Sequence, residues 1–532
     1  MTPNITDIIR QHVTLSVSCI DRLYLHAYMP KLQTSGGLCY FLHDHLSHPI
    51  PSPALFRPMH DRFLKAVDAF ARQHRIPTVE FKPGQRKDDI VADYRARSTP
   101  REGVVVLGTA QEKMRAFKAH KRRTATESVT FDFSRQTVAV KHFYFYVHDR
   151  DWGPAFLKIG TYVPYPVKLC LNGHEWVKQR LHRERVPFTS LDNGFLACPD
   201  PAALQAACDA LGPEDVQAFF DRWSQRLPWP MTPRDRAAGY DHRLAISQLE
   251  VSLTDVFDRP VQGRHFFEAL IRENLDLGRP DRVGLLFPFR IRRTTPPPTF
   301  GYRTRVITEG VQPSLHIEYK HSHVKQYFKE QHALRTETTI NNPNDFYVNK
   351  GIANLSHLRD LGQQVNRKLL EVERVSQQCV LSQDALDRLQ SPTVEGGQRV
   401  SALRFGDPRV MALLQAIAGF THLPGGFRNR DLRPQVEALL GRSYSRAQMT
   451  YDLRRLRLKG VIHRIPKTHR YTATTYGLKV AFFYSKLYLR ILRPQWNALL
   501  PESDQLPRPL RAALDQLDAE IQKLHEEAAL AA

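Results

Sequence analysis

The chain has 532 residues, 42% of them hydrophobic, which is enough apolar material for several globular domains and argues against a wholly disordered protein. Lys and Arg outnumber Asp and Glu by 76 to 54, giving a formal net charge of +22, which favours a polyanionic partner such as nucleic acid. Six cysteines without a Cys-x-x-Cys pair, no secretory signal and no apolar run of about 18 residues predict a reduced, cytoplasmic protein and exclude a membrane-spanning class.

The first part of the chain predicts an α/β domain over residues 1–125. Alternating residues 13–28 indicate a strand, and residues 58–74 carry apolar side chains at helical spacing. A second strand at residues 103–108 is expected to lead into a helix at residues 110–121. The N-terminus of that helix would be a phosphate site, served by the basic residues Lys113, Lys121, Arg122 and Arg123.

The central part predicts a hairpin and helical domain over residues 126–293. Residues 141–147 and 155–160 flank a turn rich in Asp and Gly, which is typical of a hairpin. Helical stretches are expected to dominate residues 174–271. The aromatic strand of the hairpin could offer stacking surfaces to unpaired bases or belong to the core.

A third domain is expected over residues 300–390, with a β segment at 302–340 followed by helices at 354–389. The β segment predicts a three-stranded meander, and side chains alternate across each strand, so polar groups collect on shared faces. This face is the candidate catalytic or phosphate-contacting surface. Its candidate catalytic residues are Glu318, Lys320, Tyr327 and Glu337.

Each of these groups has a chemical reason to be chosen. Glu318 and Glu337 could hold Mg²⁺ or Mn²⁺, and Lys320 could orient water or offset charge. Tyr327 is a possible nucleophile, because neighbouring lysines would stabilise a phosphate bound to it. A solvated sheet face with charges paired across strands is the alternative interpretation.

This segment resembles the replication initiators of filamentous phages, in which a Tyr-x-Lys strand precedes a Leu-Arg-x-Glu strand. Tyr327-Phe-Lys329 and Leu334-Arg-Thr-Glu337 match that pattern. The resemblance implies a nuclease that joins a tyrosine to DNA. That family pairs two histidines around a hydrophobic residue, whereas this chain has His321-Ser-His323, so the metal ligands stay unassigned.

Two further places carry metal-ligand residue types. Glu80-x-Lys82 has the spacing found in nuclease cores, although no aspartate strand precedes it. Asp149 and Asp151 lie at the hairpin turn, close in sequence to a helix that begins after Asn172. Asp also suits a turn and Asn suits a helix cap, so a structural role is favoured for this second group.

The most informative segment lies within residues 398–500. Residues 401–500 hold 18 Lys and Arg against 4 Asp and Glu. Asn429 is expected to cap a helix ending near Gly441, and Ser445 a second helix ending at Gly460. A hairpin with its tip at residues 466–469 follows.

This order of helix, turn, basic helix and basic hairpin resembles winged-helix domains, which implies docking of the second helix in the DNA major groove. The expected DNA contacts are Arg446, Arg454, Arg455, Arg457 and Lys459 on the helix and Lys467, His469 and Arg470 on the hairpin. Residues 501–532 are acidic, with 7 Asp and Glu against 3 Lys and Arg. They predict an amphipathic helix for docking or self-association.

Together these features predict an α/β plus α+β multidomain protein: an N-terminal α/β domain, a mixed hairpin and helical body, and a C-terminal winged helix. The expected function is nucleic-acid binding, DNA more than RNA, with metal-dependent nuclease activity of a replication or transposition protein of a mobile element. Two alternatives stay open. One is a non-enzymatic regulator or architectural DNA binder, and the other is a protein that binds structured RNA.

Overall fold

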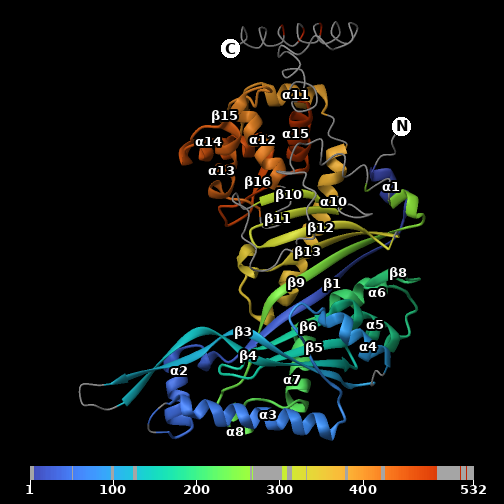
Figure 1. The fold of residues 1–532 in the computed structure, drawn as a ribbon. Helices are drawn as coiled ribbons and strands as arrows, with labels where there is room; N and C mark the ends of the chain where they lie inside the picture. The colour runs from blue at the N-terminus through green and yellow to red at the C-terminus, as the bar shows by residue number, and fades with distance from the viewer. Residues whose placement is uncertain are drawn as a thin grey trace, which may run out of the picture.

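A computed structural model describes residues 5–487, apart from 49, 51, 98–100, 124–128, 264–266, 268–301, 308–313, 331, 378–380 and 421–425, together with 516, 520 and 523. The chain is a multidomain α/β protein with a large mixed sheet and a helical unit that has its own hydrophobic core (Figure 1). Within the described residues, no helix is long and apolar enough to cross a membrane.

Eleven strands formed by the described residues make one sheet, in the order β10-β11-β12-β13-β9-β1-β6-β5-β4-β3-β2. Neighbours are antiparallel except for the parallel pair β2 and β3. The strands are β1 (Val13–Tyr28), β2 (Thr78–Glu80), β3 (Gly103–Arg123), β4 (Val129–Asp149), β5 (Gly153–Gly160), β6 (Val167–Asn172), β9 (Arg243–Phe257), β10 (Tyr302–Ile307), β11 (Ser314–Tyr319), β12 (Ser322–Lys329) and β13 (Ala333–Ile340).

The sheet consists of two halves with the same connectivity. In the first half, β1 is followed by the meander β3-β4-β5-β6, whose last strand pairs antiparallel with β1. In the second half, β9 is followed by the meander β10-β11-β12-β13, whose last strand pairs antiparallel with β9. The first α-helix after the meander is α5 (Gly173–Glu184) in the first half and α10 (Leu355–Gln377) in the second, where two short 3-10 helices precede it. The long strands β1 and β9 join the halves at the centre of the sheet.

Helices and a short hairpin cover parts of this sheet. They are α1 (Ile5–His12), α2 (Ser35–Tyr40), α3 (Phe56–Gln73), α4 (Lys87–Arg97), α6 (Pro201–Ala210), α7 (Pro213–Arg226) and α8 (Pro233–Ala237), with strands β7 (Thr189–Leu191) and β8 (Gly194–Ala197). The second half of the sheet packs on α10, because Asn366 of that helix donates to the carbonyl of Val251 at 2.9 Å. Gly362 allows the close approach, since a Cβ there would lie 2.7 Å from Val251.

The C-terminal helical unit follows α10 (orange to red in Figure 1). It contains α11 (Gln383–Gln390), β14 (Thr393–Glu395), β15 (Gln398–Val400), α12 (Pro408–Phe420), α13 (Asn429–Leu440), α14 (Arg446–Leu458), β16 (Ile462–Arg464), β17 (Tyr471–Ala473) and α15 (Thr475–Leu487). The expected cap of α14 is confirmed, because Ser445 accepts from the Gln448 N–H. Gly441 and Gly460 end α13 and α14 with φ of 64° and 74°. Asn429 is the first residue of α13, so the expected cap position is one residue late.

The helix expected at residues 110–121 is wrong, because β3 continues to Arg123. This segment has helix-forming residues, but it pairs with β4 over its whole length. Sheet pairing and burial of Ala116 and Phe117 therefore override local propensity. The expected phosphate site at the N-terminus of this helix is therefore also wrong. Lys113, Lys121 and Arg122 are exposed strand residues, and Arg123 ends the strand.

The expectation of helices throughout residues 174–271 is wrong for residues 243–257, which form β9. This strand is central, with β1 on one side and β13 on the other. Its apolar side chains Ile246, Leu249, Val251 and Leu253 are buried. The helices α5, α6, α7 and α8 fall inside the expected helical stretch.

The other expected elements lie close to their predicted positions. The strand at residues 13–28, the helix near 58–74, the hairpin of β4 and β5, and the meander of β11, β12 and β13 are confirmed. One sheet holds strands from the three domains expected before residue 390, and those boundaries stay predictions. The acidic helix expected at residues 501–532 lies outside the described residues, except for three positions.

Candidate functional sites

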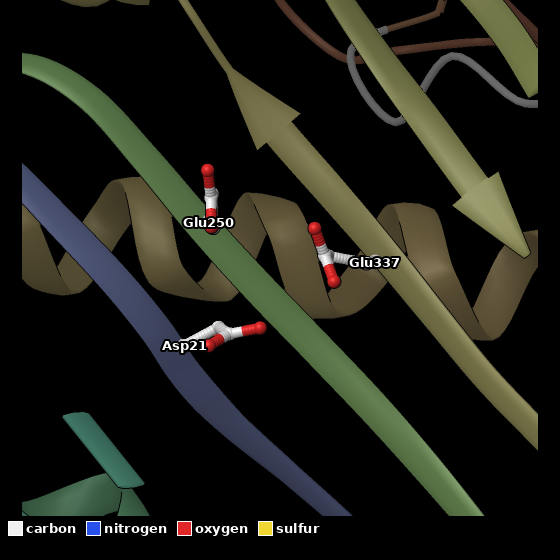
Figure 2. A group of neighbouring side chains, drawn as sticks. All are labelled: Asp21, Glu250 and Glu337. Atoms are coloured by element: carbon white, nitrogen blue, oxygen red, sulfur yellow. The ribbon is translucent and has the colours of Figure 1, made fainter. Parts of the chain in front are cut away.

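Three carboxylates meet where the halves of the sheet join. Asp21 lies on β1, Glu250 on β9 and Glu337 on β13, which are three neighbouring strands. One carboxylate oxygen from each lies within 4.8 Å of the other two. Figure 2 shows these side chains gathered on one face of the sheet, with α10 behind the strands. We call this group the acidic cluster.

The pairing of β1 with β9 places Asp21 beside Glu250, next to a β-bulge. Ile20 pairs with Val251 and Leu23 pairs with Leu249, so two residues of β1 lie opposite the single residue Glu250. A bulge of this kind re-aims a side chain without ending the strand. Asp21 follows Ile20 and so lies on the same face as Glu250, while the bulge returns Leu23 to the face of Leu249.

Arg335 is the internal cation of the acidic cluster. Its side chain is fully buried on β13, and its guanidinium donates to Asp21 at 2.5 Å. Its Nε lies 3.7 Å from Glu337 Oε2. The same guanidinium contacts His174 Nε2 at 2.9 Å and donates to the carbonyl of Asn193. Arg335 is therefore a positioning residue that fixes one side of the cluster.

The pKa values show that one arginine does not neutralise three carboxylates. Burial, with the charges of Glu337 and Asp21, raises the pKa of Glu250 to about 7. Burial and the Asp21 charge also raise the pKa of Glu337. Burial opposes ionisation of Asp21, but Arg335 and His174 hold its pKa below the ordinary value. Full ionisation of the three carboxylates is thus disfavoured in the absence of a further cation.

Tyr327 adjoins the acidic cluster on β12. Its hydroxyl donates to Glu337 Oε2 at 3.3 Å, and Lys325 Nζ lies 4.3 Å from the centre of its ring. Burial and the Glu337 charge raise the pKa of Tyr327, so its hydroxyl stays protonated at neutral pH. A phenol, a carboxylate acceptor and an ammonium group thus lie within one short part of the sheet.

The acidic cluster could hold a hard divalent cation. Carboxylate oxygens are the ligands that Mg²⁺ and Mn²⁺ prefer, and here they come from strands with fixed register. The raised pKa values of Glu250 and Glu337 fit such a cation, because its charge would relieve the repulsion. The donor set therefore fits Mg²⁺ or Mn²⁺.

The structure brings together Glu337 and Tyr327 and separates the other two residues expected beside them. Glu318 is buried on β11, paired with His323, and β11 is two strands away from β13, about 10 Å. Lys320 lies in the turn after β11 and donates to the carbonyl of Asp345 at 3.3 Å. Neither belongs to the acidic cluster, so their grouping with Glu337 is wrong.

Most of the other candidate residues from the sequence order a turn or pack in the core. Asp149 is fully buried and accepts from the N–H groups of Asp151 and Trp152 and from Trp223 Nε1 at 2.8 Å. Asp151 accepts from Arg222 at 2.9 Å, so both aspartates order the turn. The aromatic side chains of the hairpin are largely core: Phe143, Tyr144, Phe145 and Tyr146 are buried. Glu80 is exposed at the end of β2.

The second candidate site is the outer surface of α14. Arg446, Arg454 and Arg457 are exposed and lie along one stripe of the helix. On the hairpin between β16 and β17, Lys467 and His469 are exposed. We call these five residues the basic face.

Three of the expected DNA contacts also bind groups within the protein. Arg455 is buried, donates to the carbonyl of Ser401 at 3.3 Å and lies 3.5 Å from Asp452. Lys459 is buried and donates to two carbonyl groups that precede β14, at 2.6 and 2.7 Å. Arg470 is half-buried and donates to the carbonyl of Gly426 at 3.1 Å.

Comparison of the chain with protein-family models, curated proteins and solved structures finds no match. The resemblances to winged-helix domains and to phage initiators therefore stay predictions. The acidic cluster and the basic face are the two features of the molecule that bear on its function.

Proposed function

We propose that the C-terminal unit is a winged-helix domain and that the protein binds duplex DNA through the basic face. The observation that supports this most is the division of cations on α14. Arg446, Arg454 and Arg457 point outward, while Arg455 and Lys459 tie the inner side of the helix to neighbouring segments. The helix thus presents an ordered row of guanidinium groups to phosphates and base edges.

The test is binding of the full-length protein to a labelled duplex, measured by fluorescence anisotropy over a range of salt concentrations. Removing one cation that neutralises a phosphate reduces the salt slope by about 0.9, so the triple variant Arg446→Gln, Arg454→Gln and Arg457→Gln is expected to lower the slope by about two to three units. The matched control, Arg57→Gln with Arg75→Gln, removes exposed cations far from α14 and should leave the slope unchanged. Equal slopes for all three proteins would refute the proposal.

A second candidate function is metal-dependent phosphodiester cleavage at the acidic cluster. The specific observation that favours it is the hydrogen bond from Tyr327 to Glu337 within a cluster that fits a divalent cation. The cation would stabilise negative charge on the phosphate and on the attacking oxygen. This activity would distinguish the protein from a regulator or architectural binder.

The chain supplies the groups for a balanced transesterification. The Tyr327 oxygen would attack phosphorus and form an O–P bond, while the P–O bond to the leaving nucleotide hydroxyl breaks. Glu337 accepts the tyrosine proton, and a proton is returned to the leaving oxygen. Lys325, beside the ring of Tyr327, offsets phosphate charge.

Single-stranded and duplex oligonucleotides with Mg²⁺ or Mn²⁺ test this activity, read as cut product and as protein–DNA adduct on denaturing gels. Tyr327→Phe removes only the hydroxyl and is expected to abolish the adduct. Glu250→Gln should weaken the dependence of cleavage on the metal without loss of DNA affinity. The control Glu80→Gln should leave both the metal dependence and the DNA affinity unchanged. Full activity of both Tyr327→Phe and Glu250→Gln would refute this site. An excess of RNA competitor tests the RNA-binding alternative in the same mixture.

A further inference from the structure

A tyrosine between the sheet and the C-terminal unit is surrounded by cations. Tyr347 follows the turn Pro343–Phe346, and 43% of its surface is exposed. Arg470 lies 4.5 Å from the centre of its ring, and Arg428 and Lys320 each lie 5.1 Å away. Three cationic groups thus gather around one aromatic ring.

The two arginines come from the C-terminal unit, and the lysine and tyrosine come from the sheet. Arg428 directly precedes α13, and Arg470 directly precedes β17. Lys320 lies in the turn between β11 and β12. The group thus spans the contact between the two parts of the molecule, which Figure 1 shows beside β10 and β11. We call it the junction cluster.

The arginines of the junction cluster have unused hydrogen-bonding capacity. The Nε atoms of Arg428 and Arg470 are buried and have no hydrogen-bond partner among the described residues. Neither guanidinium forms an ion pair with a carboxylate in the part of the chain that the structure describes. A buried N–H without an acceptor costs about 1–3 kcal/mol, more when the group is charged. Both arginines are only partly buried, so an anion can approach their other N–H groups, and two neighbouring guanidinium groups without a described carboxylate partner favour one.

Two acidic side chains lie near the junction cluster, and both are engaged elsewhere. Asp345 accepts from the His321 N–H and from Ser322, at 3.1 and 3.0 Å. Asp431 accepts from the backbone N–H of Arg428 at 2.9 Å and lies 3.8 Å from Arg430. They leave the guanidinium groups available.

The junction cluster is continuous with the basic face. Asn429, next to Arg428, donates to the carbonyl of Arg446 at 3.2 Å and to Thr450 at 3.0 Å. Arg446 is the first arginine of the exposed row on α14. A strand of DNA lying along this row would pass the N-terminus of α13, where guanidinium groups and helix N–H groups both favour phosphate.

We propose that the junction cluster binds a backbone phosphate of the nucleic acid held by the basic face. This inference rests on the proposed DNA binding and adds a contact that orients the DNA relative to the sheet. Tyr347 holds the guanidinium planes by cation–π contact, and the phosphate accepts from the guanidinium N–H groups that are not covered by the protein.

The experiment uses full-length protein with the paired change Arg428→Gln and Arg470→Gln. We expect the salt slope of duplex binding to fall by about one to two units, with about a tenfold loss of affinity near 0.1 M salt. Arg428→Lys with Arg470→Lys keeps both charges and should retain most of the slope. The control Arg57→Gln with Arg75→Gln should behave as wild type.

Three other results would overturn the proposal. The first is an unchanged slope in the Gln pair, with or without a lower melting temperature, which would make the cluster a contact between domains only. The second is binding of inorganic phosphate, followed by calorimetry, that disappears in the Gln pair while its DNA slope stays at the wild-type value. That would assign the site to a small phosphate compound. The third is no DNA binding by wild-type protein, which would refute the basic face as well.

Discussion

Glu373 provides a direct test of how the sheet and α10 are held together. Its side chain is 5% exposed and accepts from Gln326 Nε2 at 3.2 Å. Burial raises the pKa of Glu373 from 4.5 to about 8, with a smaller contribution from the Asp255 charge and partial relief from Gln326. The folded protein therefore keeps this carboxyl protonated at neutral pH.

The sign of the effect follows from the higher pKa in the folded state. The protonated Glu373 carboxyl contributes to the free energy of unfolding. This contribution is fully present below pH 4.5 and is lost as the pH rises through 8. A shift from 4.5 to about 8 corresponds to about 5 kcal/mol as an upper limit. Glu373→Gln stays neutral and retains an acceptor for Gln326. The free energy of unfolding of this variant should equal that of wild type at pH 5 and be higher than that of wild type by about 2–5 kcal/mol at pH 9.

Urea unfolding followed by circular dichroism at the two pH values provides the measurement. Glu371→Gln is the matched control, because Glu371 lies on the same helix with 42% of its side chain exposed. It should change stability little, and equally at both pH values. A Glu373→Gln variant that gained nothing at pH 9 would show that Glu373 is ionised in the fold, and the reasoning from burial would fail.

Further predictions concern three other buried contacts. Arg455→Ala removes one of the two arginines beside Asp452, since Arg409 also binds that carboxylate at 2.7 Å, and it should cost about 1–3 kcal/mol, measured by thermal unfolding, while DNA affinity of the folded protein persists. Arg335→Leu leaves Asp21 buried without its cation and should destabilise the protein by about 3–5 kcal/mol in urea, with part of this stability recovered in Mn²⁺. Gly362→Ala places a Cβ 2.7 Å from a valine of β9 and should cost about 1–3 kcal/mol in the same urea assay.

Local signals in the sequence predict the elements that depend on local chemistry. The bounds of α14 follow from the Ser445 cap and the Gly460 stop, and both are confirmed. Alternation along β12 and β13 correctly places Tyr327 and Glu337 on one face. Helical spacing also places Arg455 beside the buried residue Asp452, a signal that would have identified it as internal.

Long-range pairing cannot be predicted in the same way. Sequence reasoning misses Asp21 and Glu250 because they meet only when β1 pairs with β9. Alternation within residues 243–257 is present, but the surrounding helices favour a helical interpretation. Residues 110–121 show the reverse case, since a segment of helix-forming residues extends a strand when a partner strand lies beside it.

The duplicated arrangement of the sheet also bears on synthesis of the protein. Asp21 is made early, whereas Glu250 and Glu337 come from the second half of the sheet. A nascent chain that contains only the first half has one of the three carboxylates and lacks Tyr327. Any reaction carried by this group must wait until residue 337 has left the ribosome and β1 has found β9. Under the proposed cleavage activity, chains that end before Glu337 would therefore be unable to cleave DNA.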